Sequence, residues 1–406
     1  MRKINPHNFH IATRGTSREI NRQIALNLVH THQPISRADL ARLMGMRRGA
    51  VSLIVNDLLA EGVIFEGSTG ESHRGRKPTF LYIDSRQRCV VAVDIRVTGT
   101  YLRVTDLLGR QLVATSNFAT DRDPKRMVAA LGKRIKKVLA DHKDVGVCEG
   151  IGVVIPGMVD RTTSRIIYAP TLGWRNVEIR ESLAAVTGLP IHVENSGKAC
   201  ALAQMWAVRG DVGAGGDLVF VSVSDGIGVG VVVNGEILRG HHNIAGEFGH
   251  VPLSIDGPRC SCGATGCWEA YVSNLATLSR YFGRDLREAK PIAADIASFT
   301  IGDLIVRARA GDAKAIAAVQ ATARYLGLGL ASIVNAVDPS RIYIGGEIIA
   351  AWDLIESAVR TALAERALSP DAAKTEIRTI SLEDHPRLRG AVALVSAPAF
   401  AAPAVA

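Results

Sequence analysis

The chain has 406 residues, of which 47% are hydrophobic and 21% are charged. This composition is that of a globular protein with an ample core, and the length favours two or three domains over one. No apolar run reaches the roughly 20 residues that cross a bilayer, and no apolar stretch follows the basic N-terminal residues as it would in a signal peptide. We therefore expect a cytoplasmic protein with no membrane partner.

The formal net charge of +9 is unevenly distributed. Residues 1–83 carry 12 Lys and Arg against 6 Asp and Glu, a net charge of +6, so the much longer remainder holds only +3. A basic end on a near-neutral body predicts a nucleic-acid-binding module joined to a second unit. An ordinary solvated basic surface is the alternative, because charge alone does not separate the two.

Apolar residues at helical spacing predict three helices before residue 62. Ser36 is expected to cap the second helix, while Gly45 and Gly62 are expected to end the second and third. The predicted inward residues of the three helices are, in order, Ile20, Ile24, Leu28 and Val29; Leu40 and Leu43; and Val51, Ile54, Val55, Leu58 and Leu59. A longer helix followed by two short helices with a tight glycine-containing turn matches a helix-turn-helix.

The outward face of the third helix offers hydrogen-bond donors near its start. These donors, which suit phosphates and base edges in a major groove, are Arg47, Arg48, Ser52 and Asn56. Strands at 63–65 and 80–83 predict a hairpin, whose loop carries Arg74, Arg76 and Lys77 and would fit a narrow minor groove. We predict a winged helix-turn-helix that binds double-stranded DNA. A three-helix packing or dimerisation module is the alternative.

From residue 90 the pattern changes to strands mixed with helices, which predicts an α/β fold. We expect strands within 89–112, 150–160, 189–195 and 218–238, and an amphipathic helix at 127–142. Similar openings at residues 90 and 217 predict two related halves with a cleft between them. The stretch VENSGK, residues 193–198, lies between an apolar run and a helix, where α/β proteins place ligand-binding loops.

Four residues have the spacing of metal ligands: His250, Cys260, Cys262 and Cys267, in the pattern H-x9-C-x-C-x4-C. Three thiolates and one imidazole predict a closed, structural zinc site, with free thiols or a disulfide as alternatives. Glu247 and Glu269 flank the cluster, and a bound zinc ion would fix the backbone that positions their carboxylates toward a polyol. The other cysteines, which stand in apolar surroundings, are expected to be buried thiols.

The stretch 246–269 resembles the ROK family, named for its repressors, open reading frames and sugar kinases. The resemblance is carried by its G-E-x-G-H start and its C-x-C-G-x-x-G-C-x-E end. A winged helix-turn-helix before the α/β body is similar to the family's repressors of the xylose and N-acetylglucosamine type. The resemblance implies an actin-like body with two ribonuclease-H-like subdomains, at 84–205 and 206–385, after a DNA-binding domain at 1–83. It also implies a C-terminal helix, at about 386–402, that returns to the first subdomain.

The resemblance also implies a site and partners. The family's sugar contacts fall on Asn195, Glu247, His250 and Glu269, so His250 would bind zinc through one ring nitrogen and sugar through the other. The implied partners are an operator, a sugar or sugar derivative, and further copies of the chain in a homodimer or homotetramer.

Three departures from the kinase pattern predict that the ligand domain is not catalytic. Ser196 stands where family kinases have an Asp general base, whose loss typically costs ~10²–10⁴-fold in rate. Arg96 crowds the first phosphate loop, and Asp225 replaces a Thr where a carboxylate would repel ATP. We therefore predict a sugar-responsive repressor, with an ATP-dependent sugar kinase carrying a DNA module as the alternative. Lys198 is expected to be an exposed helix residue, with a cation near the cleft that favours an acidic or phosphorylated sugar as the alternative.

Overall fold

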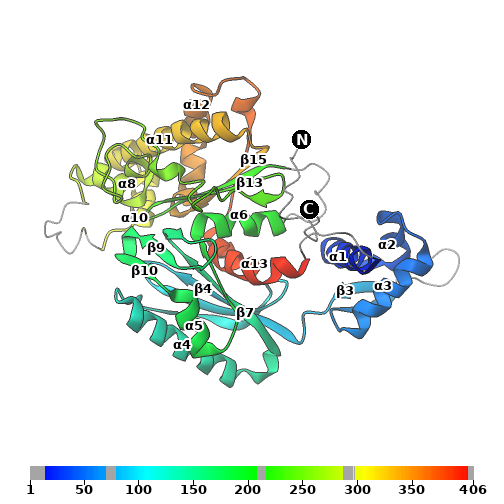
Figure 1. Ribbon diagram of the computed structural model, residues 1–406. Coiled ribbons are helices and arrows are strands. Elements are labelled where there is room, and N and C mark those ends of the chain that lie inside the picture. The colour runs from blue at the N-terminus through cyan, green and yellow to red at the C-terminus, as the bar shows by residue number, and fades with distance from the viewer. Residues whose placement is uncertain (1–13, 70–78, 208–215, 287–295, 297, 401–406) are drawn as a thin grey trace.

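The body of the protein contains two five-stranded sheets with the same topology (Figure 1). The computed structural model describes residues 14–69, 79–207, 216–286, 296 and 298–400. The first sheet has the order β6-β5-β4-β7-β11 and the second β14-β13-β12-β15-β16. In each sheet three consecutive antiparallel strands are followed by two strands that run parallel to the first. The predicted α/β fold with two related halves is therefore confirmed.

The strands of the first sheet are β4 (Arg88–Ile95), β5 (Thr100–Asp106), β6 (Gln111–Phe118), β7 (Val147–Ile155) and β11 (Ile191–Asn195). Those of the second are β12 (Leu218–Val223), β13 (Ile227–Val233), β14 (Glu236–Ile237), β15 (Arg341–Gly346) and β16 (Glu376–Thr379). The central strands β4 and β12 are buried along nearly their whole length. Their unbroken Val-rich runs reflect coverage on both faces. A small sheet of β8 (Met158–Val159), β9 (Ile166–Ala169) and β10 (Trp174–Val177) adjoins the first half.

Helices cover both sheets. The first half carries α4 (Pro124–Asp141) and α5 (Ile179–Thr187); the second carries α7 (Glu269–Val272), α8 (Asn274–Phe282), α10 (Ile301–Arg309), α11 (Ala313–Val337) and α12 (Trp352–Ala364). By length and composition α11 could cross a membrane. However, its buried face forms the core of the second half together with strands β12, β13 and β15. Helix α11 is thus a core helix. Its Ala-rich sequence explains why it was not recognised as an apolar run in the sequence.

Two helices, α6 (Ser196–Ala207) and α13 (Pro386–Phe400), lie side by side between the two sheets (Figure 1). Helix α13 packs on β4 and β7 of the first sheet, and α6 packs on β12 and β13 of the second. Glycines allow both close approaches. A Cβ added at Gly152 would lie 1.9 Å from the carbonyl oxygen of Ala391, and one added at Gly230 would lie 2.2 Å from that of Gly197.

We predict that Gly152→Ala displaces α13 from the first sheet. The new methyl group would meet helix backbone, which cannot rotate away, so we expect destabilisation by about 1–3 kcal/mol, typical of an overpacked core. Thermal unfolding of the purified variant would measure this loss. Gly302→Ala, at an exposed position in α10 with no close backbone contact, is the control. Equal melting temperatures for the two variants would contradict the close packing of α13.

The first 83 residues contribute α1 (Arg14–His32), β1 (Ile35–Ser36), α2 (Arg37–Leu43), α3 (Arg48–Ala60), β2 (Ile64–Thr69) and β3 (Thr79–Ile83). Ser36 caps α2 by accepting a hydrogen bond from the Asp39 amide at 3.1 Å, as predicted. Strands β2 and β3 form the predicted hairpin. The predicted set of inward-facing residues of α1 was partly wrong. Ile24 is exposed, and the buried residues that face the core are Ala25, Leu26 and Val29. Leu43 is also exposed, because α2 buries Leu40 and Ala41 instead.

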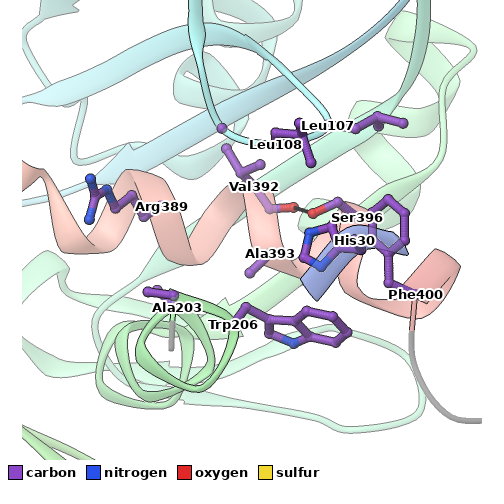
Figure 2. Close-up of a pocket in the computed structure, with 12 residues that line it drawn as sticks. His30, Leu107, Leu108, Ala203, Trp206, Arg389, Val392, Ala393, Ser396 and Phe400 are labelled. Atoms are coloured by element: carbon purple, nitrogen blue, oxygen red, sulfur yellow. Dashed lines mark hydrogen bonds between the residues drawn. The ribbon is translucent and has the colours of Figure 1, made fainter. Parts of the chain in front are cut away.

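The end of α13 joins this N-terminal module to the body. The ring of Phe400 is buried in the module's apolar core and stacks on His30 of α1 with a centroid separation of 4.3 Å. Asn27 of α1 donates a hydrogen bond to the Phe400 carbonyl at 2.6 Å, and Trp206, near the end of α6, meets His30 edge to face. Figure 2 shows these three rings beside a cavity of about 300 Å³ between α1, α6, α13 and the turn after β5.

Candidate ligand cleft and metal cluster

A pocket at the cleft between the two halves brings together all four predicted sugar contacts. Asn195 comes from the end of β11, Glu247 and His250 from a loop after β14, and Glu269 from the start of α7. The carboxyl end of β11 in one half and the turn after β12 in the other line the same pocket, which is where sheets of this kind place ligands. The remaining lining residues include Arg96, Val97, Pro156, Gly157, Pro170, Thr171, Ser196, Asp225, Gly226, Ile227, Gly228, Ser261 and Arg387.

The side chain of Asn195 caps the start of helix α6. Its side-chain oxygen accepts hydrogen bonds from the amides of Gly197 at 2.8 Å and Lys198 at 3.3 Å, so it satisfies the free N–H groups of the first turn of α6. Its amide nitrogen donates to the carbonyl of Gly157 at 2.8 Å. The positive φ of 104° at Gly157 and the backbone packed against it exclude a side chain there. One amide proton of Asn195 remains available to a ligand.

Glu247 has more unfilled hydrogen-bonding capacity than Asn195. No described residue donates a hydrogen bond to its carboxylate, although burial raises the pKa of this group. The attraction of Lys198 and then of His250 acts in the opposite direction. A partly desolvated carboxylate that lines a cleft without donors gains most from a ligand that brings hydroxyl groups.

The four predicted metal ligands lie together. One ligand atom from each of His250, Cys260, Cys262 and Cys267 lies within 4.8 Å of the others. The Nδ1 atom of His250 is 3.6 Å from the Cys260 sulfur, and the sulfurs of Cys262 and Cys267 are 3.8 Å apart. Burial, followed by the neighbouring Cys260 sulfur, raises the pKa of Cys267 to about 12. The cluster could hold a metal ion, which would replace these thiol protons.

Glu269 connects the cysteine loop to the turn after β12. One carboxylate oxygen accepts from the Ser261 hydroxyl at 2.8 Å and lies 3.4 Å from the Cys260 sulfur, while the other accepts from the Ile227 amide at 3.0 Å. A Cβ added at Gly226 would lie 2.6 Å from this carboxylate, so a larger residue there would displace the Glu269 side chain. Glu269 therefore links the cysteine loop directly to the residues that line the cleft.

Lys198 is 2% exposed, so the expectation of an exposed helix residue was wrong. Its ammonium donates to the Asn243 carbonyl, and Arg239 pairs with the buried carboxylate of Glu194 next to it. Burial lowers the pKa of Lys198, whereas the nearby carboxylates of Glu194 and Glu247 act to raise it. Its position on a helix suggested that Lys198 is exposed to solvent, because its acceptor, the Asn243 carbonyl, comes from a distant loop.

The far end of the cleft carries two arginines around one buried carboxylate. Asp94 has no exposed surface; its Oδ2 is 2.6 Å from Nε of Arg96, and its Oδ1 is 3.7 Å from a guanidinium nitrogen of Arg387 on α13. Arg96 thus returns along its own loop and occupies the space beside Asp94. The crowding by Arg96 was predictable from the sequence, but the approach of Arg387, which lies almost 300 residues away, was not. The residues around Arg387 indicated no more than a basic side chain at the start of a predicted helix.

Asp225 and Ser196 are the other two positions at which the sequence departs from the kinase pattern. Burial, and then the Glu347 carboxylate, raise the pKa of Asp225. Ser196 is buried at the first position of α6, and its neighbours in the pocket include Gly228 across the cleft. No carboxylate stands at position 196, so this position supplies no general base.

Four of the predicted DNA-contacting residues lie at the start of α3 and along its first turns. Arg47 and Arg48 are exposed at the start of α3, Ser52 is half-buried, and Asn56 is exposed one turn further on. The Asn56 carbonyl oxygen accepts a hydrogen bond from Arg37 at 2.9 Å, a contact that sequence analysis missed. The hairpin-loop residues Arg74, Arg76 and Lys77 lie outside the described part of the chain.

The duplicated sheet, with a pocket between its halves, defines an actin-like α/β protein. The family model described as ROK family matches residues 90–397. The chain belongs to the ROK family.

Three relatives show the range of that family. The xylose repressor of Bacillus subtilis (strain 168) is 28% identical over 361 residues, which cover 88% of this chain and 90% of the repressor. The glucokinase of Streptomyces coelicolor is 32% identical over 282 residues, 66% of this chain and 85% of the kinase. The crystal structure of a ROK family transcriptional regulator, a homologue of the E. coli MLC protein, has a TM-score of 0.78 at 24% identity. That match covers 95% of this chain and 97% of the regulator, and it shows the common fold.

Proposed function

We propose that this protein is a sugar-responsive transcriptional repressor of carbohydrate-metabolism genes. One observation carries the proposal: α6 and α13 both begin at the ligand cleft and both end against the N-terminal module. Asn195 and Ser196 stand at the start of α6, and Arg387 at the start of α13. Trp206 and Phe400, at the far ends of these helices, contact His30 of α1. The match to the xylose repressor along both parts of the chain supports this reading.

In this proposal the N-terminal module is a winged helix-turn-helix. Helix α3 enters the major groove with Arg47, Arg48, Ser52 and Asn56, and the β2–β3 hairpin is the wing, whose loop carries Arg74, Arg76 and Lys77. A homodimer would place two α3 helices in successive major grooves of a palindromic operator. We propose the domain boundaries that the sequence predicts, with 1–83 binding DNA, 84–205 and 206–385 forming the ligand body, and the C-terminal helix returning to the first half.

The effector in this proposal is a sugar or sugar derivative held by Asn195, Glu247, His250 and Glu269. Because Nδ1 of His250 faces Cys260, its Nε2 is the nitrogen left for the ligand. A sugar alters operator affinity only if it binds one arrangement of the two halves better than the other. We infer that closing the cleft moves α6 against α13 and so shifts the two DNA-binding modules relative to each other.

We predict that Glu247→Gln weakens effector binding by about 10- to 100-fold, since hydrogen bonds to a charged acceptor contribute roughly 1.5–3 kcal/mol. Calorimetric titration with a panel of pentoses, hexoses and their derivatives would measure the change. Glu236→Gln, at an exposed position on β14 outside the cleft, is the control. Unchanged binding of the best sugar by Glu247→Gln would show that this carboxylate does not contact the ligand.

The metal in this proposal is a structural zinc ion bound by His250, Cys260, Cys262 and Cys267. Zinc–sulfur bonds of about 2.3 Å and a zinc–nitrogen bond of about 2.0 Å place tetrahedral ligands about 3.5–3.8 Å apart. The separations of 3.6 Å and 3.8 Å between the measured donor pairs agree with this geometry. Bound zinc would fix the loop from which His250 and Glu269 reach the cleft, and would leave no position for catalytic water.

We further propose that the ligand body is not catalytic. Ser196 provides no base, Arg96 occupies the place beside Asp94, and Asp225 would repel a nucleotide phosphate. The rival function, an ATP-dependent sugar kinase with a DNA module, is favoured by the match to glucokinases. An ADP-release assay with magnesium, ATP and a hexose panel separates the two: the repressor proposal expects no sugar-dependent ADP above background, and turnover would establish the kinase.

A further inference from the structure

The outward face of α3 presents one large apolar side chain. Leu53 is 68% exposed, whereas the apolar residues on the other face of the helix are buried: Val51, Ile54, Val55 and Leu58. Leu53 therefore contributes little to the module's core. Helical spacing places it on the same face as Gly49, one turn before, and Asn56, one turn after.

The surroundings of Leu53 suit a polyanionic partner. Gly49 is exposed, and a Cβ there would meet no atom of the described residues within 4 Å, so the position one turn before Leu53 is open. Arg47 and Arg48 are exposed at the start of the helix, and the first turn holds no acidic residue. The one carboxylate of α3, Asp57, pairs with Arg18 of α1 at 2.6 Å.

Asn56, beside Leu53, has a fixed orientation. Arginine can only donate hydrogen bonds, so the amide atom that faces the guanidinium of Arg37 at 2.9 Å must be the carbonyl oxygen. Arg37 is itself held by Glu66 of β2, with contacts of 2.9 and 3.1 Å. The Asn56 amino group consequently faces away from Arg37, and no described residue accepts a hydrogen bond from it. Next to Leu53, the helix thus offers a donor rather than an acceptor.

We propose that Leu53 reads a thymine in the operator by packing on its C5-methyl group, while Asn56 donates to a base acceptor beside it. The thymine methyl is the apolar group that base pairs present in the major groove, and the thymine O4 acceptor lies on the same edge. A leucine among cations and a donor fits this base edge better than a guanine edge, which presents acceptors without a methyl group. The inference rests on the proposed DNA-binding function and names the base that α3 selects.

The test removes single methyl groups from the DNA. Starting from an operator selected with the full-length protein, each symmetric pair of thymines is replaced in turn by deoxyuridine, which lacks only the C5-methyl group. Fluorescence anisotropy then gives the operator affinity of the wild-type chain, of Leu53→Ala and of Leu368→Ala. Leu368 is 84% exposed on the body and serves as the matched control. Leucine and alanine are both good helix formers, so Leu53→Ala preserves α3.

For the wild type and Leu368→Ala, we expect one deoxyuridine pair to weaken binding by about fourfold per half-site, or roughly 15-fold for the pair. Leu53→Ala should bind the thymine operator more weakly and should not distinguish it from the deoxyuridine version. The inference is overturned if no thymine position is sensitive in the wild type, or if Leu53→Ala retains the discrimination. Failure to select any operator would instead contradict the DNA-binding function itself, and with it this inference.

Discussion

Cys262→Ser is expected to reduce bound zinc from one ion per chain to none. Cys262 is the exposed member of the cluster, so the substitution removes a ligand while disturbing little packing. Changes in the outer contacts of a metal site already cost about 10–100-fold in metal affinity, and loss of a direct ligand should cost more. Because Glu269 contacts both Ser261 and Cys260, we also expect sugar binding to weaken by at least about tenfold.

Metal analysis of the purified protein, together with sugar titration, would measure both effects. Cys148→Ser, a half-buried cysteine on β7 outside the cluster, should keep its zinc and its sugar affinity. Operator binding by Cys262→Ser in the absence of sugar should persist, because the cluster lies in the second half of the body and the N-terminal module has a separate core. Unchanged zinc content in Cys262→Ser would refute the four-ligand site.

His30→Ala is expected to uncouple sugar binding from DNA release. Allosteric coupling typically changes affinity by 5- to 150-fold, and we expect the wild-type operator affinity to fall by a factor in this range when sugar binds. His30 is the residue of α1 that both Phe400 and Trp206 contact. Without its ring, α1 loses its ring contacts with both helices and keeps the hydrogen bond from Asn27 to the Phe400 carbonyl. We expect this remaining contact to transmit little of the movement, so the factor should drop to about one to two while sugar affinity of the isolated protein stays near wild type.

Anisotropy measurements of operator binding with and without saturating sugar would test this uncoupling. His32→Ala provides the matched control, because His32 is exposed at the end of the same helix and its Nδ1 lies 3.2 Å from the Leu28 carbonyl of that helix. It should retain the wild-type response. A full sugar response in His30→Ala would show that the signal does not pass through the rings at this junction.

The sequence predicted those features that depend on local patterns. Strand segments, the cap at Ser36 and the proximity of the four metal-cluster residues followed from spacing within short stretches. The fully buried strands β4 and β12 were recognisable because both of their faces are covered, which leaves continuous apolar runs. The two related halves were visible from the repeated openings at residues 90 and 217.

Features that depend on distant partners were not predictable in this way. Lys198 looked solvent-exposed because its acceptor, the Asn243 carbonyl, lies 45 residues away. The link between Arg387 and Asp94 joins the last helix to the first strand of the body. Ile24 was assigned to the core because its spacing fits a helical stripe. Which stripe of α1 is buried depends on where α2, α3 and Phe400 pack, and that is a tertiary property.

The most direct test of the repressor account is selection of genomic DNA by the purified, zinc-loaded protein, followed by a sugar titration on the sites recovered. The account predicts a small set of palindromic sites whose affinity falls by at least about fivefold when one sugar is added, with the cleft variant Glu247→Gln requiring more of that sugar. Recovery of no specific site by folded protein, or of sites whose affinity no sugar or sugar derivative changes, would contradict it.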